Sequence, residues 1–207
     1  MILYVWKTQQ LGIKTFEHLY MVFITLIIVI IIAISIGIFL HKRQNLSNII
    51  LNFLNAIESV PELALLVILI PLFGIGVKPT LVASVLYSIL PIARNTYVGL
   101  TNVDFQYIEI ARAIGLSDKE ILWKVRIPLA LPLLAAGIRI AIVFTMGVVT
   151  LGGLIAAGGL GGPIQTGIHL YDKNIIMVTG LWIGILAVLL DSMGNFFETL
   201  LRKRYGQ

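Results

Sequence analysis

Residues 109–128, EIARAIGLSDKEILWKVRIP, form a charged and amphipathic interval in an otherwise strongly apolar chain. Gly115 favours the left-handed backbone that ends a helix, and Ser117 with Glu120 has the spacing of a capping box that starts one. The interval therefore predicts two short helices joined by a tight turn, with Pro128 ending the second helix and opening the next. The apolar side chains on these helices are Phe105, Ile108, Ile114, Ile121, Leu122 and Val125. Because the interval is too charged to enter lipid, we expect these side chains to contact protein.

The composition of the whole chain indicates a membrane protein. Its 207 residues are 58% hydrophobic and 12% charged, and the mean hydropathy is +0.99. A soluble domain of this length could not bury so much apolar surface, so the fold class expected is an all-α integral membrane protein. The sequence contains no cysteine, which excludes disulfides and thiol catalysis. The net charge of +5 is assigned to membrane topology and not to nucleic acid.

Five stretches are long and apolar enough to cross a bilayer, which needs roughly 20 residues per helix. They are about 19–40, 49–73, 79–100, 131–154 and 175–200. Lys and Arg concentrate after the first span, between the third and fourth, and at the C-terminus, which all lie on one side. The positive-inside rule places that side, with the C-terminus and the two-helix loop, in the cytoplasm and the N-terminus outside. We expect one membrane domain over 1–207, with its core at about 19–200.

The second span contains two acids around a proline, in the sequence Glu58-Ser59-Val60-Pro61-Glu62. Pro61 cannot donate to the helix ladder, so a break or kink is expected that faces the bundle interior or a solute pathway. Glu58 and Glu62 are then either pathway residues that meet a cationic or zwitterionic solute, or kink residues that snorkel or pair with Arg94.

Two further charges lie inside predicted spans. Arg139 in the fourth span and Asp191 in the fifth span lie at matching depths from their cytoplasmic ends, at about 1.5 Å per residue. An unpaired charge at that depth is costly, so we expect the two side chains to form an ion pair. A structural clasp is the favoured role, and gating is the alternative.

Glycines crowd the outer end of the fourth span, among them Gly158, Gly159 and Gly161. Such a segment permits close backbone approach and unusual dihedral angles. It lacks the Lys-Ser or Lys-Thr of a P-loop, and no β-strand is expected before it. Two interpretations remain open: a flexible outer gate or docking loop, and small-residue helix packing with a plain turn.

Neither a metal site nor a catalytic centre is expected in this chain. The three histidines, His18, His41 and His169, are far apart and are assigned to the membrane edges. The serines have no nucleophile elbow. There is also no nucleotide-binding motif, so any energy from ATP has to enter through another polypeptide.

The interval 109–128 resembles the EAA loop of ABC-importer permeases: Glu-Ala-Ala, three residues, Gly, nine residues, Ile, one residue, Leu-Pro. Glu109, Ala111, Gly115 and Pro128 match this pattern, whereas Ile110 replaces the Ala at its second position and two later positions carry apolar replacements. By resemblance, the loop 104–128 sits in a groove of an ATPase, with Glu109 and Gly115 fixing its geometry. The coupling residues implied are Glu109, Ala111, Gly115, Val125, Ile127 and Pro128.

The resemblance extends over about 19–200, and the five-span order is that of the methionine-importer-like permease domain. Segments such as LYSILPIARNTYVGL and IPLALPLLAAGIR resemble the glycine betaine, carnitine and choline osmoprotectant permeases. At residues 58–62, however, this chain has Glu-Ser-Val-Pro-Glu where these permeases usually have Gln-Thr-Ile-Pro-Ser.

This family implies a prokaryotic cytoplasmic membrane protein without a cofactor of its own. Its expected partners are two ATPase subunits that carry ATP and Mg, a second permease copy or paralogue, and an extracytoplasmic solute-binding protein. The alternative from the residues alone is a self-contained secondary transporter or channel, with Glu58, Glu62, Arg139 and Asp191 as an ion relay.

Overall fold

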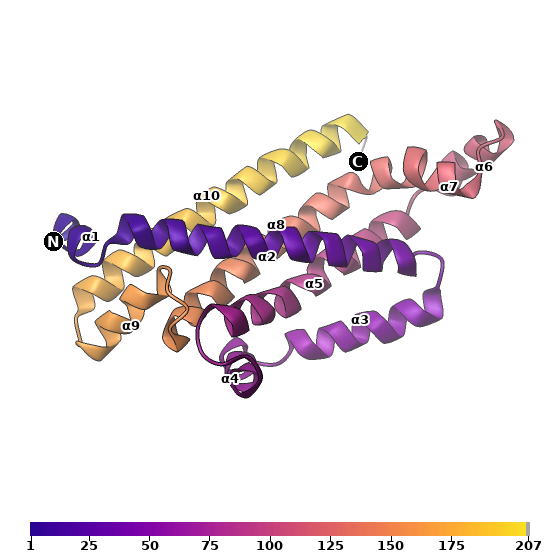
Figure 1. Ribbon diagram of the computed structural model, residues 1–207. Helices are drawn as coiled ribbons and strands as arrows, with labels where there is room; N and C mark the ends of the chain where they lie inside the picture. Colours follow the sequence, from indigo (N-terminus) through magenta and orange to yellow (C-terminus); the bar gives the residue numbers. More distant parts are fainter. Residues whose placement is uncertain (206–207) are drawn as a thin grey trace.

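The computed structural model describes residues 1–205, which form helices and turns without a β-strand. Its body is a bundle of long helices that lie side by side (Figure 1). They are α2 (Leu11–Leu40), α5 (Val77–Thr101), α8 (Ile127–Gly152) and α10 (Lys173–Tyr205). Each is long and apolar enough to cross a membrane. These helices correspond to the first, third, fourth and fifth predicted spans, and α5 packs against both α2 and α8.

The second predicted span is two helices and not one. Helix α3 (Gln44–Glu58) and helix α4 (Glu62–Phe73) are bent by 94° relative to each other. Pro61 caps α4 with an extended backbone, at φ −55° and ψ 134°, and offers no N–H to continue the helix. The predicted break is therefore present. Among the described residues there are 4 candidate spans, or 5 if this bent pair counts as one.

The two termini lie at opposite ends of the bundle (Figure 1). Near the N-terminus are α1 (Ile2–Thr8), the 3-10 helix η2 (Gly153–Ile155) and α9 (Gly161–His169). At the other end are the α2–α3 turn, α6 (Phe105–Ala113), α7 (Asp118–Ile121) and the end of α10. We call this second end the basic end, because Lys42, Arg43 and the run from Arg202 to Arg204 lie there.

Close packing of aliphatic side chains and glycines holds the bundle together. Val29, Ile92 and Val149, from α2, α5 and α8, are fully buried in one cluster. A Cβ at Gly37 would lie 2.5 Å from the Thr96 side chain, so α2 and α5 approach too closely for any larger residue. The outer faces carry many exposed aliphatic side chains, such as Ile31 at 64% exposure. Such surfaces are expected of helices that contact lipid or another membrane subunit.

Pro128 does not end the second helix of the two-helix loop, so that part of the prediction was wrong. Helix α7 passes through a π-helical turn, η1 (Leu122–Arg126), directly into α8, and Pro128 lies in the first turn of α8. The Ile127 N–H bonds the carbonyl of Leu122, five residues back. The wider π turn relieves the clash that a proline ring makes with the carbonyl four residues before it. Helix α7 and the fourth span are consequently one continuous helical rod.

Candidate functional site

The turn between α6 and α7 is built by local hydrogen bonds. Gly115 has φ +86°, in the left-handed region. The Leu116 N–H donates to the Ala111 carbonyl at 3.0 Å and the Gly115 N–H donates to that of Arg112 at 2.9 Å, which is a Schellman motif. Ser117 and Glu120 form a complete capping box at the start of α7. Both turn signals predicted from the sequence are confirmed.

The α6–α7 pair has a small core of its own. Ile108, Ala111 and Ile121 are each 3% exposed, and Val125 packs against them. The structure therefore places two of the six candidate coupling residues, Ala111 and Val125, inside the pair. Ile127 and Pro128 lie in the first turn of α8 and are partly buried.

The surface of α6 away from this core is open and carries exposed apolar side chains together with the polar Gln106. Phe105, Ile110 and Ile114 are 63%, 61% and 72% exposed, and the exposed Glu109 lies among them. We call these four residues the α6 outer face. An apolar surface of this kind next to charged residues is typical of a docking site for another protein.

The pair is connected to three long helices. It continues into α8 through the π turn, and Asp118 forms an ion pair of 2.8 Å with Lys42 at the end of α2. Arg126 donates from Nη1 to the Leu100 carbonyl near the end of α5, at 2.5 Å. The Lys124 ammonium and the Ser117 N–H hold the pKa of Glu120 at about 2, so this carboxylate stays charged at physiological pH. A displacement of the pair would consequently reach α2, α5 and α8 together.

The helix break brings the predicted acids to the junction of α3, α4, α5 and α8. Glu58 is the last residue of α3, Glu62 is the first of α4, and both are partly buried. The Glu62 carboxylate faces α8, since a Cβ at Gly147 would lie 3.7 Å from its Oε2. In residues 1–205 neither acid has an ion-pair partner within 4 Å, and Arg94 acts on Glu58 only at longer range. Direct pairing with Arg94 is therefore absent there, whereas the pathway role and the snorkelling of kink residues both stay open.

The glycine-rich segment is packed tightly against α2 and α8. The N–H of Gly159 donates to the Glu17 carboxylate at 3.0 Å, and its neighbour Gly158 has φ +83°. A Cβ at Gly161 would lie 2.0 Å from the Thr150 carbonyl oxygen. These contacts favour the packing interpretation over the gate. His18, assigned to a membrane edge from the sequence, is instead fully buried because this segment covers it.

Gly161→Ala is expected to destabilise the protein, whereas Gly162→Ala is not. The added methyl group at position 161 overlaps the Thr150 carbonyl, and overpacking of this kind typically costs about 1–3 kcal/mol. A Cβ at Gly162 meets nothing within 4 Å. The measurement is the temperature at which the detergent-purified protein loses its monodisperse elution peak. Equal temperatures for the two variants would show that the close contact at Gly161 does not matter.

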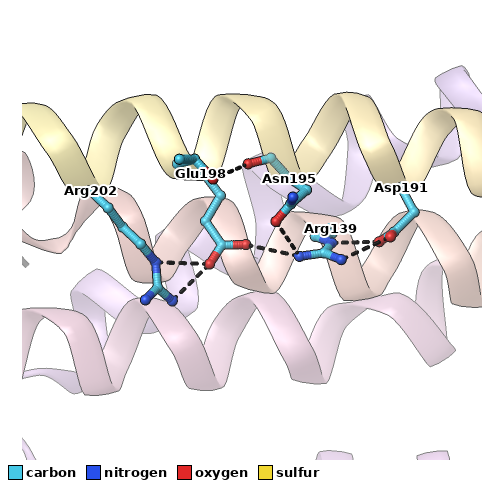
Figure 2. A network of polar contacts seen from close by, with 6 residues as sticks. Arg139, Asp191, Asn195, Glu198 and Arg202 are labelled. Carbon is cyan, nitrogen blue, oxygen red and sulfur yellow. Dashed lines mark hydrogen bonds and ion pairs between the residues drawn. The ribbon is translucent and has the colours of Figure 1, made fainter.

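Arg139 and Asp191 contact each other as the sequence predicted (Figure 2). The Arg139 Nη2 donates to Asp191 Oδ2 at 2.8 Å, and its Nε donates to the other carboxylate oxygen. The contact is part of a larger network: Arg139 also reaches Asn195 at 2.8 Å and Glu198 at 3.5 Å, and Glu198 pairs with Arg202 at 2.8 Å. Sequence reasoning missed these last three residues. Their spacing of three and four residues along α10 was the available signal.

This network lies on the outside of the isolated chain. The side chains of Arg139 and Asp191 are 32% and 33% exposed, beside a depression lined by Ile140, Val143 and Phe144 of α8. Two cations and two anions balance, so the network is neutral overall. A charged group at mid-span is stable only against protein or water, which indicates that this face of α8 and α10 is covered in the membrane.

Comparison with known proteins identifies the family. The family model of the binding-protein-dependent transport system inner membrane component matches residues 27–207. The chain belongs to this family. It is a permease subunit of an ABC-type importer and a non-catalytic component of the inner membrane, in a family whose ATPase is on partner subunits. The importer permease that the interval 109–128 suggested is confirmed.

Several relatives and solved structures resemble this permease over most of its length. It is 38% identical over 178 residues to the glycine betaine/carnitine/choline transport system permease protein OpuCB of Bacillus subtilis, covering 86% of this chain and 82% of the relative. It is 37% identical over 192 residues to the osmoprotectant import permease protein OsmW of Salmonella typhimurium, covering 90% and 89%. Its fold matches a chain of the inward-facing MetNI methionine ABC transporter, with a TM-score of 0.85, 24% identity and coverage of 94% and 97%.

Proposed function

We propose that this permease imports a small zwitterionic or quaternary-ammonium osmoprotectant of the glycine betaine, carnitine and choline class. The names of the relatives support the solute class, and their alignments extend over most of both chains. The observation that carries the coupling mechanism is the α6 outer face, an open apolar surface on a rigid helix pair that is tied to three long helices.

In this mechanism the α6 outer face fits a groove of an ATPase subunit. Glu109 lies on that face, and Gly115 sets the angle between α6 and α7. When two ATPase subunits bind ATP and Mg and close, they displace the pair, and the continuous rod of η1 and α8 transmits the movement to the fourth span. The contacts of Lys42 and Arg126 carry the same movement to α2 and α5.

The remaining partners follow from the two ends of the bundle. The positive-inside rule puts the basic end in the cytoplasm and the N-terminal end outside. The outer end, with α1, α9 and the glycine-rich segment, then faces an extracytoplasmic solute-binding protein. A second copy or a paralogue of the permease completes the pathway and covers outward faces that one chain leaves open.

The helix break supplies the polar part of the pathway. Within residues 1–205, Glu58 and Glu62 have no ion-pair partner within 4 Å, and they lie on either side of the break that Pro61 creates. Carboxylates at this position attract the ammonium group of a betaine or of choline by charge. Gly158, Gly159 and Gly161 lie toward the outer end, where they fix the backbone around Glu17 and Thr150.

Reconstitution tests this function directly. Proteoliposomes containing the permease, its ATPase and its binding protein are expected to accumulate radiolabelled glycine betaine, carnitine or choline only when hydrolysable ATP is present. A non-hydrolysable ATP analogue serves as the control. Uptake driven by an ion gradient in liposomes that contain this chain alone would instead establish the self-contained secondary transporter.

A further inference from the structure

The exposed side of α3 is divided lengthwise into a polar and an apolar strip. The polar strip consists of four exposed asparagines, spaced three, four and three residues apart so that they lie on one side of the helix. They are Asn45, Asn48, Asn52 and Asn55. The adjoining apolar strip contains Ile49 and Phe53, which are 67% and 65% exposed. Leu51 and Leu54 on the remaining side are buried in the bundle core.

The four asparagine side chains lack partners. Within the described part of the chain, no hydrogen bond is made by any of their amide groups. Helix α3 nevertheless lies inside the bundle region. It runs beside the halves of α2 and α5 that are nearer the basic end (Figure 1). An amide that faces hydrocarbon without a partner is costly, so this strip has to contact water or another protein.

The strip connects the basic end to the helix break. Helix α3 starts beside Lys42 and Arg43 and has 15 residues. At about 1.5 Å per residue it extends about 22 Å into a hydrocarbon core of about 30 Å. It ends at Glu58, and the exposed Ser59 and the partly buried Glu62 continue the polar surface beyond it. Polar groups therefore run without interruption from one end of the bundle to the two unpaired acids.

We propose that the four asparagines line the cytoplasmic half of the solute pathway as a water-filled lane. The unpaired carboxylates at its inner end need hydration, which a dry contact with a second copy would deny to them and to the four amides. Amides both donate and accept hydrogen bonds and carry no charge. They can replace the water around a zwitterion without retaining either of its charged groups, so the solute moves on toward the cytoplasm. The identity of the solute rests on the proposed function, whereas the presence of water in the lane does not.

The absence of native cysteine makes the lane directly testable. Single cysteines are placed at Asn48, Asn52 and Asn55. Cysteines at Ile49 and Phe53 serve as controls, because these side chains are also highly exposed in the isolated chain. The permease is assembled with its ATPase in inside-out vesicles and treated with a charged, membrane-impermeant maleimide. Only a thiolate in water reacts, so the asparagine positions are expected to be labelled at least tenfold faster than the two controls.

The outcomes separate this inference from the proposed function. Equal labelling on both strips overturns the lane, and so do slow labelling at the asparagine positions and disulfide cross-links between two copies there. If the complex takes up glycine betaine but the asparagine positions are unreactive, only the lane is wrong. If those positions are labelled in a complex that shows no ATP-dependent uptake, the lane stands and the proposed function is wrong. Asn45→Cys provides a fourth position, so the result does not depend on the folding of one variant.

Discussion

Gly115→Val is expected to reduce ATP-dependent uptake and ATPase assembly by tenfold or more. Gly115 has φ +86°, where a side chain costs roughly 1–2 kcal/mol and a β-branched one is disfavoured further. Relieving that strain opens the Schellman turn, so the α6 outer face is presented at the wrong angle to the ATPase. About 1.4 kcal/mol corresponds to a factor of ten in binding. The measurements are ATPase co-purification and glycine betaine uptake at equal permease levels in the membrane.

Gly115→Asn is the matched control for this prediction. Asparagine tolerates the left-handed region, and a Cβ at position 115 meets nothing within 4 Å, so steric overlap does not distinguish the two variants. Near-normal assembly and uptake are expected for Asn. If Val behaved like wild type, the turn would have no role in coupling. If Asn failed as badly as Val, the loss would come from any side chain there and not from the backbone.

Arg139→Met is expected to lower the amount of folded permease several-fold. The substitution removes the cation between Asp191 and Glu198 and leaves an excess negative charge in the middle of α10. A charge near the centre of a spanning helix costs about 3 kcal/mol by insertion measurements. Asp191→Leu is expected to lower the amount of folded permease similarly, because it leaves an excess positive charge on Arg139. The measurement is the amount of monodisperse protein extracted from membranes.

The double variant of Arg139→Met and Asp191→Leu tests the pairing itself. It removes one charge of each sign and leaves the Glu198–Arg202 pair of 2.8 Å intact, so it is expected to accumulate better than either single variant. An exchange of the two charges is a poorer test, since an acid at position 139 would face Glu198. Accumulation of the double variant no better than that of the single variants would show that the contact is not a clasp. Normal folding with impaired uptake would favour the gating alternative.

The features predicted correctly from the sequence depend on residues that are close together in the chain. The Gly115 turn and the Ser117–Glu120 box are completed within a few residues, and the missing N–H of Pro61 breaks a helix wherever that helix lies. Long apolar stretches likewise identified four of the helices, because a span needs only its own backbone hydrogen bonds. The contact between Arg139 and Asp191 could be predicted because a charge inside the membrane can pair only with a charge at the same depth.

The features that escaped prediction depend on which helices lie side by side. The π turn before Pro128 keeps α7 and α8 in one rod, and at the 94° bend α4 leaves the line of α3 and packs on α5 and α8. The burial of His18 required the glycine-rich segment to fold back onto α2.

The membrane class, the positions of most helices and the two-helix loop were predictable from the amino-acid sequence, since hydropathy, capping and proline act locally. Three features followed from the tertiary structure alone: Glu198 joins the Arg139 contact, Glu58 and Glu62 have no ion-pair partner among residues 1–205, and the asparagines of α3 form an open strip. These properties are set by distances and exposure between segments far apart in the chain. Local sequence preferences do not encode them.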